Sequence, residues 1–142
     1  MGKALIIKGA DFSANSIGKV VTYIDYTEKF TFTDNLNIVA DETNRNFGKT
    51  HQSSMGAASN FVNILGASSI KMKFINYPVN GNGTGGVVFY TSDKTPIVQR
   101  GYFRESDDFS MVEKKIDVPS NAAFVRVTIL IGHNSEFFAH IY

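Results

Sequence analysis

The sequence predicts an all-β protein, an antiparallel β-sandwich of the jelly-roll type with a short N-terminal arm. Apolar and polar residues alternate with a period of two in several stretches, most clearly in residues 69–79, SIKMKFINYPV. Clusters of Gly, Asn, Ser and Pro separate these stretches at short intervals, as in sandwiches and jelly rolls. Helical spacing is weak and confined to residues 55–63, so we expect no helix.

The stretch that organises the rest is residues 85–104, GGVVFYTSDKTPIVQRGYFR. Its first part is rich in β-branched and aromatic residues, which suit a half-buried pleated surface. Residues 91–96 are turn formers, and Pro96 cannot donate a hydrogen bond to a strand ladder. Apolar residues then resume, which predicts two antiparallel strands. Such a pair is stable only when its apolar face meets a second sheet, with Phe89 pointing inward.

The other strands should supply that second sheet. We expect them at residues 4–7, 20–24, 28–33, 36–39, 61–65, 69–79, 111–118, 123–131 and 136–142. Residues 34–59 are the most polar part of the chain, and we expect a long loop there that carries one short strand and forms a candidate binding surface. The run NGNGTGG at residues 80–86 favours a hairpin turn, because Asn and Gly accept positive φ at little cost.

The 142 residues fit one domain, which at this length buries roughly 68–70% of its unfolded surface. We expect the sandwich to span residues 25–142 and to be built around phenylalanine, since the chain has twelve Phe and no Trp. Residues 1–24 have too few apolar groups to fold alone. They predict an arm that docks on the main domain or on a neighbouring subunit, with an ordinary edge strand as an equal alternative.

Composition excludes several classes of function. The formal net charge is +1 with no basic stripe, so we expect no nucleic-acid partner. The absence of cysteine removes disulfides and thiolate chemistry and leaves the compartment open. The chain contains no apolar window of about 20 residues, so we expect no membrane insertion. The apolar run near the N-terminus has only four residues, so we expect no signal peptide.

The sequence contains no recognisable catalytic constellation, and we predict that the protein is not an enzyme. The three histidines are far apart, and no G-x-S-x-G elbow is present. The glycine run lacks the ending and the following helix that a phosphate loop needs. We therefore expect no cofactor, with calcium as the one alternative, held by carboxylates of Asp41, Glu42 and Asp93.

The remaining interpretation is binding. Tyrosine rings can stack on the C–H groups of a sugar, and guanidinium groups can hydrogen-bond its hydroxyls. The alternative is that such tyrosines complete the core, which we favour for Tyr90. The candidate glycan-binding residues are Tyr77, Arg100, Tyr102, Arg104 and Arg126.

Three segments resemble a known family. IIKGADFSANSIGKV near the N-terminus, GGVVFYTSDKTPIV and VPSNAAFVRVTI resemble segments of jelly-roll domains in tail, fibre and adhesion proteins of phages and prophages of gut Bacteroidetes. These segments cover about a third of the chain and appear in the family's order. The usual Asp after Phe-Tyr is Thr91 here, with Asp93 as a replacement.

The resemblance implies a structural or adhesion component of a phage particle: a fibre, decoration or receptor-binding protein located in the virion. It implies partners among other virion proteins, reached through the N-terminal arm, and a homo-oligomer, with a trimer favoured. A cell-surface glycan is a possible ligand. The alternative is a stand-alone carbohydrate-binding module of a secreted bacterial protein at the cell surface.

Overall fold

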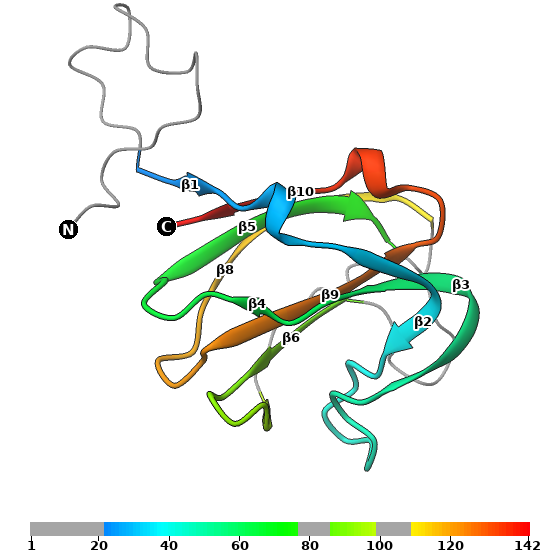
Figure 1. The fold of residues 1–142 in the computed structure, drawn as a ribbon, viewed down its shortest axis with the longest axis horizontal. Helices are drawn as coiled ribbons and strands as arrows, with labels where there is room; N and C mark the ends of the chain where they lie inside the picture. The colour runs from blue at the N-terminus through cyan, green and yellow to red at the C-terminus, as the bar shows by residue number, and fades with distance from the viewer. Residues whose placement is uncertain (1–21, 77–85, 99–108) are drawn as a thin grey trace, which may run out of the picture.

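The computed structural model describes residues 22–76, 86–98 and 109–142. They form two antiparallel sheets packed face to face, which confirms the predicted β-sandwich (Figure 1). The first sheet has four strands in the order β1 (Ile24–Asp25), β10 (Phe138–Ile141), β5 (Ser69–Ile75) and β8 (Met111–Asp117). The second has β2 (Phe32–Ile38), β3 (Thr50–Ser59), β9 (Phe124–Leu130), β6 (Gly86–Tyr90) and β7 (Pro96–Ile97) in that order, and β4 (Val62–Asn63) also pairs with β9.

The chain passes repeatedly from one sheet to the other, as in a jelly roll. Strands β4, β6 and β9 lie in the six-stranded sheet, and β5, β8 and β10, which follow them in the chain, lie in the four-stranded sheet. Two 3-10 turns, η4 (Thr27–Lys29) and η5 (Asn134–Glu136), are the helical elements of the described residues. None of the helices in these ranges is long and apolar enough to cross a membrane.

The main core fills the space between the sheets. Strand β5 contributes Ile70, Met72 and Phe74, and β9 contributes alternate residues from Val125 to Ile129, all completely buried. The alternation predicted for residues 69–79 therefore holds through Ile75, with Lys71 and Lys73 on the opposite face. Phe89 and Val127 point inward, at 2% and 0% exposure, as expected from the sequence.

A second, smaller core lies on the outer face of the six-stranded sheet. The end of β2 and residues 39–49 fold over this face, so that Ile38 and Ala40 pack on Ala58, Val88 and Tyr90. The covering segment is closed by two backbone hydrogen bonds, from the Val39 N–H to the Lys49 carbonyl and from the Gly48 N–H to the Val39 carbonyl. We call residues 36–52 the flap.

The flap corrects one prediction. Residues 34–59 were expected to form a long loop, but β2 and β3 occupy most of them. The strand β3, THQSSMGAAS, lacks the usual β-forming residues. It forms because Gly56, Ala57 and Ala58 are small enough to be buried in a closely packed sheet; a Cβ on Gly56 would lie 2.8 Å from the Leu36 carbonyl oxygen.

The strand boundaries were also wrong in two smaller places. Residues 28–33 begin as the turn η4, and β2 starts only at Phe32, because the Asp25 carboxylate accepts the Thr27 N–H at 2.9 Å and bends the chain between the sheets. The strand expected at 61–65 is reduced to Val62–Asn63, since the Asn63 side chain accepts the Leu65 N–H and turns the chain.

The predicted arm, residues 1–24, lies outside the described residues except for its last three. Within these, Ile24 pairs with Ile141, so strand β1 forms the edge of the four-stranded sheet beside β10 (Figure 1). The glycine run at 80–86 and the second half of the 85–104 stretch also lie outside the described residues, apart from Gly86 and the residues up to Val98.

Candidate functional site

Four of the five predicted glycan-binding residues, Tyr77, Arg100, Tyr102 and Arg104, lie outside the described residues. Arg126 lies on β9, on the outer face of the six-stranded sheet, opposite Val88. Its Nε donates to the Ser59 carbonyl oxygen at 2.9 Å, and its guanidinium carbon lies 4.5 Å from the centre of the Phe61 ring. Arg126 therefore ties β9 to the end of β3 and is half-buried in doing so.

Tyr90 lies beside Arg126 and is part of the core, as expected. Its hydroxyl donates to the Gly48 carbonyl oxygen at 2.7 Å, which fastens the flap to β6. Burial raises the pKa of Tyr90 to about 12, and the charge and hydrogen bond of Arg126 only partly offset that rise. The phenol is therefore held in its neutral form.

A second cation shares the aromatic surface with Arg126. The Nζ of Lys94 lies 4.9 Å from the centre of the Phe61 ring and 5.6 Å from that of Phe124. Lys94 has a φ of 66°, a conformation that non-glycine residues adopt at a cost, within a turn closed by Thr91 and Thr95. Hydrogen bonds from Thr91 and then Thr95 hold the pKa of Asp93 below its usual value.

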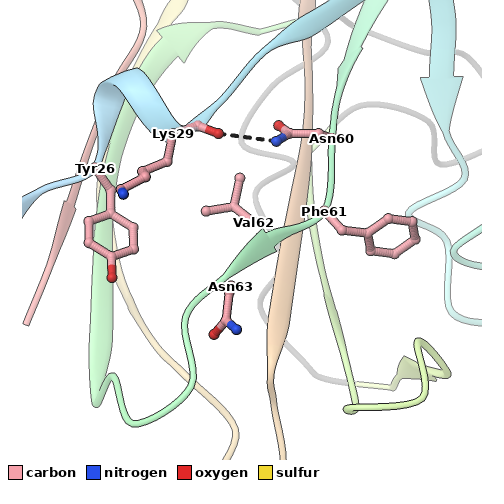
Figure 2. Close-up of a pocket in the computed structure, with 6 residues that line it drawn as sticks. All are labelled: Tyr26, Lys29, Asn60, Phe61, Val62 and Asn63. Carbon is pink, nitrogen blue, oxygen red and sulfur yellow. Dashed lines mark hydrogen bonds between the residues drawn. The ribbon is translucent and has the colours of Figure 1, made fainter.

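A cleft in the described part of the chain lies elsewhere, between η4 and β4, at the side where the chain passes from the first sheet to the second. It has a volume of about 330 Å³, within the range of small-molecule sites. The residues that line it are Tyr26, Lys29, Asn60, Phe61, Val62 and Asn63. Figure 2 shows the Tyr26 ring at the left, Val62 in the centre and the Asn63 amide below it, while the Phe61 ring points away.

Asn60 gives the cleft its rigid upper wall. Its side-chain nitrogen donates to the Lys29 carbonyl oxygen at 3.1 Å, and its side-chain oxygen accepts the Thr31 N–H at 3.0 Å (Figure 2). Both ends of the amide are thus engaged with the backbone around η4. Asn60 holds the two walls of the cleft at a fixed separation, and little of its hydrogen-bonding capacity remains for a ligand.

Asn63 and Tyr26 carry the hydrogen-bonding groups that remain available. The Asn63 side-chain oxygen accepts the Leu65 N–H at 2.9 Å, which fixes the side chain, while its amide nitrogen has no hydrogen-bond partner among the described residues. The Tyr26 ring packs against the main core, and its hydroxyl likewise has no partner in the described ranges. Lys29 lies above the ring, with its Nζ 5.8 Å from the ring centre.

Sequence reasoning missed Tyr26 and Asn63 as site residues. They are 37 positions apart (63 − 26), and each sits in a short segment without a motif. They meet because β1 pairs with β10 in one sheet while β4 pairs with β9 in the other. A tyrosine just after a strand and an Asn-Phe-Val-Asn run at a strand end were the only signals available.

A second, shallower hollow of about 280 Å³ opens on the flap and is lined by Asn35, Gln52, Ser53 and Ser54. It exists because the pairing of β2 and β3 jumps from Asp34–Ala57 to Leu36–Gln52. One residue on β2, Asn35 with a φ of 62°, therefore faces a longer bulge on β3. This hollow is polar and solvated.

Two of the three carboxylates predicted to hold calcium are engaged within the chain, whereas Oε2 of the third, Glu42, is buried without a hydrogen-bond partner among the described residues. The Asp41 carboxylate accepts the Thr43 N–H at 2.9 Å and the Thr43 hydroxyl at 2.7 Å, and Asp93 accepts the Thr91 hydroxyl. Within residues 22–76, 86–98 and 109–142, no group of three or more His, Cys, Asp or Glu side chains could hold a metal ion.

Comparison with known proteins adds little to this geometry. No protein-family model matches the chain, and no curated protein matches it. Among solved structures, a CBM35 domain from Paenibacillus barcinonensis is similar at a TM-score of 0.31 and 19% sequence identity, over 86% of this chain and 97% of that one. A likeness at this level says nothing about what either chain binds.

Proposed function

We propose that this protein is a non-catalytic β-sandwich domain that binds a glycan in the cleft between η4 and β4. One observation carries the proposal: the Tyr26 ring and the Asn63 amide, whose nitrogen has no partner among the described residues, line one cleft that Asn60 holds in place. An aromatic ring offers a surface for the C–H groups of a sugar, and amide and ammonium groups donate hydrogen bonds to its hydroxyls.

The fixed positions of these groups favour binding. The Asn63 rotamer is held by the hydrogen bond from the Leu65 N–H, and the Tyr26 ring is held by its packing on the core. A ligand therefore orders few side chains when it enters, which reduces the entropic cost of binding. Lys29 is exposed at the rim, where its ammonium can reach a ligand hydroxyl.

The substitution Asn63→Asp tests the cleft directly. It keeps the oxygen that accepts the Leu65 N–H but removes the amide donor and adds a negative charge. We expect glycan affinity, measured by calorimetry with the best ligand from a glycan array, to fall at least about tenfold, which corresponds to the loss of one well-formed hydrogen bond.

The matched control is Asn44→Asp. Asn44 also uses its side-chain oxygen to accept a backbone N–H, that of Asn46, but it lies on the flap. The glycan affinity of the Asn44→Asp variant should equal that of the wild type. If the array shows no ligand for the wild type, or if Asn63→Asp binds as the wild type does, the cleft is not the site. Tyr102→Ala and Arg104→Ala on the same array test the residues predicted from sequence.

The phage-like segments favour a second candidate, a structural or adhesion component of a virion. A particle protein of this kind would assemble through symmetric contacts, and the expected state is a trimer. Size-exclusion chromatography with light scattering on the full chain should then give three times the mass of the 15.7-kDa protomer. A monomer across micromolar concentrations would contradict this candidate but would leave glycan binding intact.

A further inference from the structure

The outer face of the four-stranded sheet carries aromatic side chains where a solvent-facing sheet normally carries polar ones. On β10, Ala139 and Ile141 point into the core, whereas Phe138 and His140 point outward and are half-buried. Tyr142 continues the outward register, and Tyr23 joins the row from the chain beside β1. We call Tyr23, Phe138, His140 and Tyr142 the aromatic stripe.

The rings of the stripe are stacked against one another. The His140 ring lies 4.1 Å from that of Tyr23 and 4.6 Å from that of Phe138, centre to centre, with 19° between the planes in both pairs. The Tyr142 ring is tilted against Tyr23 at 6.0 Å. The stack covers both faces of His140 and one face each of Tyr23 and Phe138, so the middle of the stripe offers a ring edge, which carries partial positive charge.

Two lysines add full positive charge at the two ends of the stripe. The Nζ of Lys115 lies 3.7 Å from the centre of the Tyr142 ring, and the Nζ of Lys73 lies 5.9 Å from that of Phe138. Neither lysine has an ion-pair partner among the described residues. Glu113, which pairs with Lys73 in the strand register, is taken by Lys71 at 3.1 Å. Asp25, opposite His140, accepts the Thr27 N–H.

We propose that the aromatic stripe binds a linear acidic polysaccharide that lies along β10. The strand from Phe138 to Tyr142 spans about 13 Å at roughly 3.3 Å per residue, enough for two or three sugar units. Anionic groups would meet Lys73 and Lys115 at the ends and the partially positive ring edge between them. This inference extends the proposed glycan-binding function to a separate surface and a charged ligand class.

The stacking argues against a nucleic acid as the occupant. Single-stranded nucleic acids bind through bases that stack on free aromatic faces, whereas His140 has both faces and Tyr23 and Phe138 have one face each covered by the stack. The two lysines argue against a neutral sugar, which gains little from their charge. The complementary charge of an acidic polymer accounts for both the ring edges and the lysines.

Dextran and dextran sulfate provide a matched pair of probes, because they share a backbone and differ in charge. We expect the full-length protein to bind dextran sulfate, to release it as salt is raised, and to ignore dextran. The double substitution Lys73→Gln and Lys115→Gln should weaken binding of dextran sulfate about tenfold or more. The control, Lys49→Gln with Lys94→Gln, removes the same charge elsewhere and should change affinity by less than about twofold.

These measurements test the stripe and the cleft as two independent binding sites. Asn63→Asp should leave binding of dextran sulfate unchanged, and the Lys73 and Lys115 double variant should leave binding of the array ligand unchanged, so either surface can fail alone. If the two double lysine variants weaken binding of dextran sulfate equally, the proposed site on the stripe is wrong. That result would show that the polymer is attracted only to the net positive charge of the protein. Binding of an oligo(dT) strand as tight as that of dextran sulfate would overturn the choice of polysaccharide.

Discussion

Replacing Gly48 by alanine should lower the free energy of unfolding by about 3–5 kcal/mol, the largest loss that we expect from a single methyl group in this protein. Gly48 has a φ of 79°, which costs an alanine about 1–2 kcal/mol. A Cβ there would also lie 2.3 Å from Cγ and 2.5 Å from Cβ of Pro96, a rigid ring that cannot rotate away. The flap would have to lift from β7 to make room.

Gly132→Ala is the matched control, because Gly132 has nearly the same φ, 83°, with no atom within 4 Å of the added Cβ. This variant should lose only about 1–2 kcal/mol of its free energy of unfolding, the cost of a positive φ for alanine. Urea unfolding followed by circular dichroism measures both variants. Similar losses in the two would mean that the contact between Gly48 and Pro96 does not hold the flap.

Raising the pH from 10 to 12 should destabilise the wild type by about 2 kcal/mol more than Tyr90→Phe. The folded-state pKa of Tyr90 is about 12, whereas a tyrosine in the unfolded chain titrates near 10. A raised folded-state pKa means that this contribution to stability is complete below pH 10. It is lost as the pH rises towards 12, because only the unfolded chain ionises freely.

Urea unfolding at pH 7, 10 and 12 checks the sign as well as the size. At pH 7 the Tyr90→Phe variant should be less stable by about 1–3 kcal/mol, because the buried Gly48 carbonyl loses its hydrogen bond. The difference in free energy of unfolding between the wild type and Tyr90→Phe should then narrow or reverse at pH 12. A constant gap would show that Tyr90 ionises as readily in the folded protein as in the unfolded chain.

The fold class could be predicted from the sequence because, in the clearest strands, the pattern of apolar residues matches the side chains that are buried. Strand β5 alternates buried Ile70, Met72 and Phe74 with outward lysines, and β9 turns Val125, Val127 and Ile129 towards the main core within a nearly continuous apolar run. Side-chain period reports which face meets the core, so two such strands suffice to predict two layers. The pattern also placed Tyr90 in the interior.

Strand β3, which begins at the end of the flap, could not be predicted by the same reasoning. Residues such as Ser53, Gly56 and Ala58 have little preference for strand, and β3 forms because close packing and pairing on both sides favour small side chains there. The cleft was hidden for a related reason. The meeting of Tyr26 with Asn63 depends on two strand registers in two sheets, and a single sequence contains no record of which strands pair.

The aromatic residues at the end of the chain were visible, but their role was not. Residues 136–142 were expected to form a strand, and they include four aromatic or histidine side chains after Glu136 that the sequence shows directly, ending in Tyr142. The sequence could not show that β10 lies inside the four-stranded sheet, between β1 and β5. That position brings Tyr23 and the lysines of β5 and β8 around it.

The two separate cores imply that the molecule contains two cooperative units of different strength. The flap rests on a few side chains of the smaller core and on the bond between Tyr90 and Gly48, and neither contributes to the space between the sheets. It can therefore detach while the sandwich stays folded, a local opening that amide hydrogen exchange would register well below the global free energy. Such an opening would expose Val88 and Ala58, so a long-stored sample is most vulnerable to self-association through this face.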